Sequence, residues 1–144
     1  MHRFLYEQHI KGTPEKSLVV DKKALVCHLS KSVKNDLGFY PGKVYINTKV
    51  LKHLYDKRPA EEFDCIVTNL KSIVKHPDSI YENKDSKRAG LCLIKQINNT
   101  DYIVCIEALE DNEIIIVTSF RVRKASYLKD YKLLWSWRGG NPSS

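Results

Sequence analysis

The stretch that decides the fold is Asn112-Glu113-Ile114-Ile115-Ile116-Val117-Thr118-Ser119-Phe120-Arg121-Val122-Arg123-Lys124. Its first half contains four consecutive β-branched residues, 114–117, and such a run predicts a strand that is buried on both faces. From Thr118 onward, hydroxyl and guanidinium side chains replace most of the apolar ones. Two explanations fit this change. Either the strand leaves the core and enters solvent, or a rigid central strand presents reactive and phosphate-binding groups at its end.

The composition indicates one globular domain, and we assign residues 1–144 to it. The chain has 42% hydrophobic and 28% charged residues, which is ordinary for a folded protein. Its length of 144 residues is sufficient to bury a core without disulfide bonds. The net charge is +7 and the pI is about 9.2. Such an excess of basic residues favours an acidic partner, of which nucleic acid is the commonest.

The four cysteines predict neither a disulfide framework nor a zinc site. Cys27, Cys65, Cys92 and Cys105 form no CxxC pair, and no Cys/His cluster has the spacing of zinc ligands. Three of them lie in apolar runs, where a thiol behaves as a small hydrophobe. We therefore expect reduced and mostly buried thiols, no metal or other cofactor, and folding in a reducing compartment.

The sequence also predicts a protein that is not embedded in a membrane. No apolar run approaches the length of a membrane span, and residues 1–12 lack the apolar core of a signal peptide. We expect a soluble, cytoplasmic protein. If it leaves the cell that makes it, a phage or a secretion system delivers it.

The first half of the chain predicts helices and one short strand. Asp21 is a good N-cap, and apolar residues at helical spacing follow it, which predicts a helix over 21–37. Alternation predicts a strand over 43–47, and Thr48 can cap a helix over 49–57. Pro59 then begins the clearest helix, whose apolar face consists of Phe63, Ile66, Val67, Leu70, Ile73 and Val74.

The second half predicts an antiparallel meander. A short extended piece at 79–82 precedes strands at 91–97, 102–107 and 113–120, with hairpin turns at 98–101 and 110–112. Residues 125–137 predict a short helix or turn followed by an extended tail. This order indicates an α+β fold in which N-terminal helices pack on one face of a twisted antiparallel sheet. Within it we distinguish an N-terminal helical extension, 1–40, from an α+β core, 41–144.

The order and spacing of these pieces resemble a known group of nuclease domains. The pieces that carry the resemblance are Lys52-His53-Leu54, Lys57-Arg58, the run 74–80, the strands at 91–95, 102–106 and 115–120, Tyr127-Leu128 and the run 133–140. They are similar to the phage-associated barnase, EndoU, colicin and RelE-like (BECR) ribonuclease fold. The resemblance implies a metal-independent, toxin-like endoribonuclease. Residues 1–40 match nothing in that pattern.

Metal-free RNA cleavage requires few groups. A base removes the proton of a ribose 2′-hydroxyl, which attacks the adjacent phosphorus. An acid protonates the leaving 5′-oxygen, and cations or hydroxyls stabilise the negatively charged phosphorane. The product is a 2′,3′-cyclic phosphate, and no step requires a metal ligand.

The resemblance implies catalytic roles for five residues. His53 matches the family's helix histidine and is the candidate base or acid, because histidine is the side chain suited to proton transfer near neutral pH. Lys57 and Arg58 could clamp the scissile phosphate. Thr118 could hydrogen-bond a phosphate oxygen, and Tyr127 could donate a hydrogen bond or stack on a base. The alternatives are an exposed histidine without a role, a solvated helix end and a tyrosine in the core.

The candidate nucleic-acid-binding residues are basic or hydroxyl side chains on neighbouring segments. They are Lys87, Arg88, Lys95, Ser119, Arg121, Arg123 and Lys124. Each of them alone could be ordinary solvated surface, whereas their clustering favours a binding role. Trp135 and Trp137 share one face of the extended tail. They could stack on bases, but sealing the sheet is the simpler role.

Two further classes of function stay open on the sequence. The domain could be a non-catalytic module that holds nucleic acid or an acidic protein on its basic face, or a phage accessory protein used in assembly. The partners that we expect are RNA, with tRNA as one candidate, and an acidic inhibitor or immunity protein that covers the basic cleft. The enzyme hypothesis requires His53, Arg58 and Thr118 to reach one phosphate.

Overall fold

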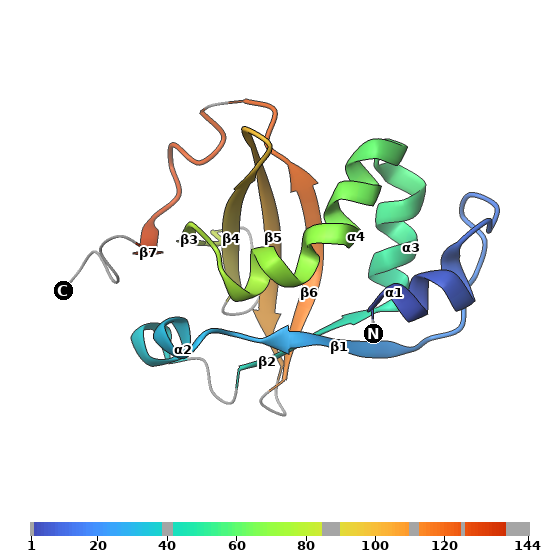
Figure 1. The fold of residues 1–144 in the computed structure, drawn as a ribbon, viewed down its shortest axis with the longest axis horizontal. Coiled ribbons are helices and arrows are strands. Elements are labelled where there is room, and N and C mark those ends of the chain that lie inside the picture. Colours follow the sequence, from blue (N-terminus) through green and yellow to red (C-terminus); the bar gives the residue numbers. More distant parts are fainter. Residues whose placement is uncertain (1, 39–41, 85–89, 110–112, 125, 138–144) are drawn as a thin grey trace.

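A computed structural model describes residues 2–38, 42–84, 90–109, 113–124 and 126–137 of the chain. Within these residues, seven strands form one sheet in the order β1-β2-β6-β5-β4-β3-β7. The strands are β1 (Lys23–His28), β2 (Lys43–Asn47), β3 (Ser79–Glu82), β4 (Gly90–Ile97), β5 (Thr100–Ala108), β6 (Ile114–Arg121) and β7 (Leu133–Ser136). The helices are α1 (His2–Leu5), the π-helix η1 (Tyr6–Ile10), α2 (Lys31–Leu37), α3 (Thr48–Lys57) and α4 (Ala60–Lys75). Figure 1 shows α4 crossing one face of the sheet with α3 at its side, so the predicted α+β fold is confirmed.

The predicted meander forms the centre of the sheet. β4 pairs with β5 and β5 with β6, both antiparallel. Asn98 and Asn99 connect β4 to β5 with φ angles of 52° and 64°. Two consecutive positive φ values are typical of a type I′ turn, whose twist matches that of the flanking strands. The turn predicted at 110–112 lies outside the described residues.

The short extended piece and the extended tail pair with each other at one edge of the sheet. β3 lies between β4 and β7 and is antiparallel to both. Trp135 in β7 is buried, and its Nε1 donates a hydrogen bond of 3.0 Å to the Asp36 carboxylate. This tryptophan therefore seals the sheet, as we expected of the tail, whereas Trp137 is exposed.

The helix predicted over 21–37 is wrong in its first half. Residues 23–28 form β1, which pairs antiparallel with β2, and the helix α2 begins only at Lys31. Ser30 caps α2, because its side chain accepts a hydrogen bond from the Val33 N–H. The spacing of the apolar residues in 24–29 fits both a helix and a strand, and pairing with β2 decides for the strand. The N-terminal segment therefore contributes a strand to the sheet.

The predicted strand over 43–47 is confirmed, and it joins the meander through a parallel pair. Val44 and Tyr45 of β2 lie opposite Ile114 and Ile115 of β6, and this register covers no further residue. Beyond that point the second half of β6 continues without β2 beside it. The sheet is therefore antiparallel except at this one junction of the described strands.

The helices α3 and α4 confirm two predictions and correct a third. Every residue of the apolar face predicted for α4 is buried. The cap predicted for α3 is wrong, because the Asn47 side chain, and not that of Thr48, accepts from the Val50 N–H. The Thr48 hydroxyl is buried and donates to the Val20 carbonyl instead. No helix of the described residues is long and apolar enough to cross a membrane.

The two faces of the sheet carry two cores of unequal size. The larger lies on the face covered by α4 and includes Ile46, Leu70 and Ile106, all fully buried. The smaller lies on the opposite face and contains Cys92, Ile94, Ile103 and Cys105. Side chains from β6 and from the 126–132 segment pack over it only in part. The second face is therefore the more accessible one.

A buried lysine fastens the segment that precedes β1. The Lys52 ammonium donates to Thr13 Oγ1 at 2.9 Å, to the Pro14 carbonyl at 2.6 Å and to Asp56 Oδ1 at 2.9 Å. The hydrogen bond from Lys52 is the largest cause that lowers the pKa of the Asp56 carboxyl. These contacts hold residues 13–16 against α3.

Candidate functional site

Beside the second half of β6, β2 no longer pairs with the strand, and side chains from the end of α3 and the start of α4 contact this open edge. On its other side, β5 pairs with β6 up to Tyr102 opposite Arg121. A bulge interrupts this pairing, because the register shifts where Cys105 faces Thr118 and Ile106 faces Ile116. Bulges bend a strand and redirect its side chains. Here the bulge falls at the point in the sequence where hydroxyl groups replace apolar ones.

Arg58, at the end of α3, makes the central contact with this edge. Its Nε donates a hydrogen bond of 3.0 Å to the Ser119 carbonyl. Its Nη2 donates one of 3.2 Å to Thr118 Oγ1. The guanidinium carbon also lies 6.0 Å from the centre of the Phe120 ring, within the range of a cation–π contact. The structure thus brings together Arg58 and Thr118, two of the predicted catalytic residues.

Glu62 organises the neighbouring positive charges, and the sequence did not single it out. Its side chain is 4% exposed, and Oε2 accepts a hydrogen bond of 3.2 Å from the Arg121 N–H. Oε1 accepts from Arg123 Nη2, and the Arg58 Nε lies 3.7 Å from Oε2. One buried carboxylate is therefore shared by the two arginine side chains. The i, i+4 spacing of Arg58 and Glu62 is a signal of helical ion pairing that could have identified it.

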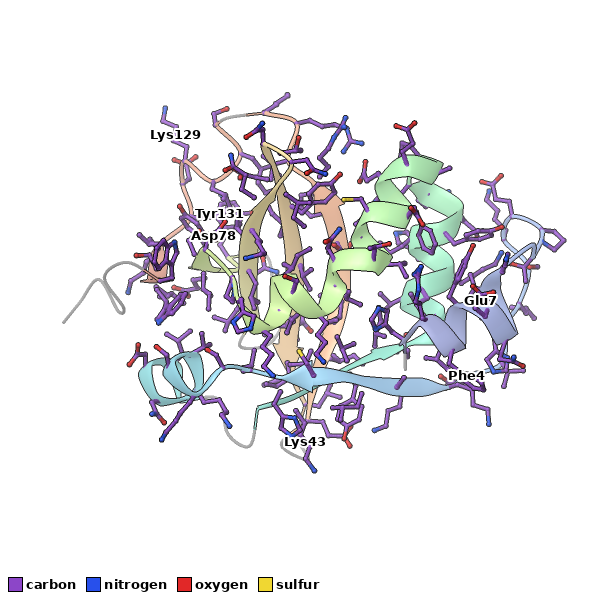
Figure 2. The ribbon with its side chains drawn as sticks, in the orientation of Figure 1. Phe4, Glu7, Lys43, Asp78, Lys129 and Tyr131 are labelled. Atoms are coloured by element: carbon purple, nitrogen blue, oxygen red, sulfur yellow. The ribbon has the colours of Figure 1, made fainter. Side chains whose placement is uncertain are left out.

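A row of aromatic rings continues from Phe120 along the open face. The Phe120 and Tyr127 ring centres are 5.4 Å apart in an edge contact, and Tyr127 stacks on Tyr131 at 5.7 Å. The Lys84 ammonium lies 4.9 Å above the Tyr131 ring. Tyr127 is 41% exposed, so it is a surface residue beside Phe120 and not a core residue. Figure 2 shows Tyr131 on the β3–β4 side of the sheet, with Lys129 pointing away from it.

His53 and Lys57 are exposed and lie on one side of α3. They are four residues apart, as neighbours on a helix surface are. Val50, one turn before His53, lines a hollow of about 560 Å³ together with Ile115 and Val117 of β6. This hollow occupies the place where β2 and β6 diverge. Of the β6 residues that line the hollow, Val117 is the last in the chain, and it directly precedes Thr118.

The other predicted binding residues lie in different places. Arg121, Arg123 and Lys124 are exposed at the end of β6, and the latter two line a hollow beside the β4–β5 turn. The Lys95 ammonium has a different partner, because it donates to the His76 carbonyl at 2.9 Å. The Ser119 hydroxyl is fully buried and donates to the Ile103 carbonyl at 2.7 Å, which argues against a contact with nucleic acid. Lys87 and Arg88 lie outside the described residues.

Tyr102 of β5 lies opposite Arg121 of β6, and its side chain belongs to the larger core on the face covered by α4. Burial raises the pKa of its hydroxyl to about 12, and a hydrogen bond with Cys65 adds to this rise. Arg121 acts in the opposite sense because its positive charge favours the phenolate. Tyr102 therefore stays protonated at neutral pH and does not serve as a base there. No group of three or more His, Cys, Asp or Glu side chains in the described ranges could hold a metal ion.

Comparison with known proteins gives one match. A family model described as phage-Barnase-EndoU-ColicinE5/D-RelE like nuclease 3 matches residues 23–130, which span β1 to the segment after β6 and contain Arg58, Glu62, Thr118 and Tyr127. Neither the curated proteins nor the solved structures contain a match. The matched region begins with β1, in agreement with the place of this strand in the sheet. The chain therefore belongs to the phage-Barnase-EndoU-ColicinE5/D-RelE like nuclease 3 family.

Proposed function

We propose that the protein is a metal-independent endoribonuclease that cleaves RNA by 2′-hydroxyl attack and releases a 2′,3′-cyclic phosphate. The observation that carries the proposal is the contact of the Arg58 guanidinium with the Thr118 hydroxyl at the open edge of β6. A guanidinium and a hydroxyl in direct contact are suited to bind two oxygens of one phosphate. Membership of a nuclease family supports the coarser part of the proposal, which is nuclease activity.

Each candidate residue has a definite task in this reaction. His53, exposed on α3, takes the proton of the 2′-hydroxyl or donates one to the leaving 5′-oxygen. Arg58 and Thr118 bind the non-bridging oxygens as negative charge develops on them. Lys57, on the same side of α3 as His53, holds the neighbouring phosphate. Tyr127, whose ring contacts Phe120, presents an exposed ring and hydroxyl to the substrate.

The charges around the site also favour a polyanionic substrate. Arg121, Arg123 and Lys124 follow Thr118 within six residues, and all three are exposed. The buried Glu62 carboxylate pairs with the Arg123 guanidinium and so neutralises part of this positive charge. An RNA strand along β6 would therefore meet cations and not the carboxylate. Binding to such a surface weakens as salt concentration rises.

The test is incubation of the purified protein with total RNA in excess EDTA, followed by analysis of the product ends. The proposal expects discrete cuts that bear a 2′,3′-cyclic phosphate. His53→Ala should remove cleavage without changing stability, because His53 is exposed. His28→Ala is the matched control, since His28 is also exposed but lies on β1. Equal loss of cleavage in both variants, or cleavage only with added metal, would contradict the proposal.

A second candidate is a non-catalytic RNA-binding module of the same fold. The observation that favours it is the use of Arg58 in the structure itself, where Nε contacts Ser119 and lies near Glu62. An arginine held in this way stabilises the edge of β6 even without a substrate. Salt-sensitive RNA binding with intact RNA, in both the wild-type protein and His53→Ala, would support this candidate.

The partners and the place of action follow from the proposed reaction. A ribonuclease with this charge acts on RNA, of which tRNA is one candidate, in the cytosol that contains it. A cell that makes the protein would need an acidic inhibitor over the Arg121–Lys124 segment. Co-expression with such a protein should restore growth in cells that make the wild-type chain. Cells that make His53→Ala should grow without it.

A further inference from the structure

Two cysteines outside the candidate site face each other across the central hairpin. Cys92 lies in β4 and Cys105 in β5, and the register places them directly opposite. Their sulfur atoms are 3.6 Å apart, close enough for one thiol to donate to the other. The side chains are 3% and 4% exposed and belong to the smaller core, on the face opposite α4.

Hydrogen bonds at both outer edges of the hairpin define the type of this pair. The Ile94 carbonyl accepts from the Asp78 N–H at 2.7 Å, which directs the backbone groups of Ile94, and of Cys92 two residues earlier, toward β3. The Asp101 carbonyl accepts from the Val122 N–H at 2.9 Å, which directs the odd-numbered residues of β5 toward β6. Cys92 and Cys105 therefore form a non-hydrogen-bonded pair between β4 and β5.

This type of pair has the spacing that a disulfide needs. Opposite Cα atoms in a non-hydrogen-bonded antiparallel pair are about 4.5 Å apart, and disulfides span Cα separations of about 4.4–6.8 Å. The two sulfur atoms must approach from 3.6 Å to a bond of about 2.05 Å. Rotation of the two side chains can supply that movement while the strands keep their register.

We propose that Cys92 and Cys105 form a disulfide site that a peroxide oxidises. One thiol reacts with hydrogen peroxide to give a sulfenic acid and water. The second thiol attacks the sulfenic sulfur, the S–S bond forms, and a second water leaves with the hydroxyl and the thiol proton. Two thiols thus lose two electrons and two hydrogens to one peroxide. This site is independent of the proposed ribonuclease activity.

The surroundings of the pair select a small oxidant and a slow reaction. Both cysteines are buried, and Leu128 and Tyr131 pack against the small core that contains them, so a bulky disulfide reagent has less access than hydrogen peroxide. The hydrogen bond with Cys92, together with burial, raises the pKa of the Cys105 thiol. Because the thiolate is the reactive form, oxidation should become faster as the pH rises.

The crosslink would act on the strand next to the candidate site. Cys105 faces Thr118 on its other side, at the bulge of β6. A bond from Cys105 to Cys92 would therefore hold β4 and β5 together behind the Arg58–Thr118 contact. Because the bond closes a loop of the unfolded chain, the oxidised protein should melt several degrees higher, on the order of 5 °C.

Tryptic mapping of the full chain tests the proposal directly. Cleavage after Arg88, Lys95 and Arg121 separates Cys92, in the peptide 89–95, from Cys105, in the peptide 96–121. Protein treated with peroxide, quenched and alkylated in denaturant should yield these two peptides as one species, lighter than their sum by two hydrogens. A reductant added before alkylation should separate them and reverse the rise in melting temperature.

Variants assign the effect to this pair. Cys65→Ala is the matched control because Cys65 lies on α4, outside the smaller core, and this variant should still form the linked species. Cys92→Ala should form none and should show no rise in melting temperature. The wild-type map decides even if a variant folds poorly. Recovery of both peptides unlinked, as thiols or as sulfinic acids, would overturn the proposal.

Discussion

The two halves of β6 are held at the same edge by different means. Ile114 and Ile115 lie beside the backbone of β2, as in any sheet. Further along, the Ser119 carbonyl and the Arg121 N–H meet the side chains of Arg58 and Glu62 instead. A guanidinium supplies the donor and a carboxylate the acceptor that a neighbouring strand would have supplied.

This difference shows how half of a strand can stay ordered at an edge where no neighbouring strand pairs with its backbone. If another strand paired with the second half of β6, it would cover the edge at Thr118. The side chains of Arg58, at the end of α3, and Glu62, at the start of α4, satisfy the same backbone groups and leave the Thr118 hydroxyl in contact with a cation. Buried backbone groups without hydrogen-bond partners destabilise a fold. The edge can therefore remain without a neighbouring strand because these two side chains supply the missing partners.

The first half should respond most strongly to a loss of packing. Ile116 is fully buried in the larger core, and Ile116→Ala should lower the free energy of unfolding by about 4 kcal/mol. Ile115 faces the opposite side and is only half-buried, so Ile115→Ala should cost clearly less. Urea unfolding of both variants measures the contrast. Equal losses would mean that the two faces of β6 are equally packed.

The second half should respond to the loss of one charge. Glu62→Ala removes the acceptor of the Arg121 N–H and the partner of Arg123, and should cost about 3 kcal/mol. Glu61→Ala is the control, because this adjacent carboxylate is exposed and its loss should change stability by less than about 0.5 kcal/mol. Urea unfolding at neutral pH measures both. A loss in Glu62→Ala no larger than that of the control would show that the arginines do not depend on the carboxylate.

A smaller effect on stability should accompany a change at Thr118. Thr118→Val keeps the shape but removes the acceptor of one Arg58 hydrogen bond, while the bond to the Ser119 carbonyl remains. We expect a loss of about 1 kcal/mol in the free energy of unfolding. RNA cleavage by the folded variant should fall at least tenfold, since about 1.4 kcal/mol of transition-state stabilisation corresponds to that factor. Unchanged cleavage would remove Thr118 from the proposed phosphate site.

The smallest expected effect is a dependence of stability on pH that arises outside β6, at α1. His2 Nε2 hydrogen-bonds the Val67 carbonyl at 2.9 Å, and burial lowers the pKa of this histidine. Its contribution to stability should be complete above the unfolded pKa of about 6.5 and should be lost as the pH falls through the lower folded pKa. Urea unfolding at pH 7.5 and pH 5 should show a larger decrease for the wild type than for His2→Gln. Parallel decreases would show that His2 titrates as in the unfolded chain.

The sequence predicted the elements whose signals are local. The apolar repeat of α4 and the β-branched run of β6 need no distant partner to be identified, and both were correct. Residues 23–28 were assigned to a helix because their apolar spacing fits both structures, and only the pairing with β2 selects a strand. Periodicity alone cannot decide such a segment.

The candidate site was predictable in its members more than in its arrangement. Arg58 and Thr118 were both expected there, and they are in contact. Glu62 was not singled out from the sequence. Its role depends on Arg121 and Arg123, which lie about 60 residues further along the chain. Ser119 was expected at the surface, but the bulge in β6 turns its hydroxyl into the sheet.

The single parallel junction between β2 and β6 has a consequence for the order of folding. It joins residues about 70 positions apart, whereas β4, β5 and β6 are consecutive hairpins. Closing a long loop costs more chain entropy than closing a short one, and parallel pairing is correspondingly slow. The meander in the centre of Figure 1 can therefore form first, and the β1–β2 ribbon docks onto it afterwards. In pulsed hydrogen exchange, the amides of β5 should gain protection before those of β2.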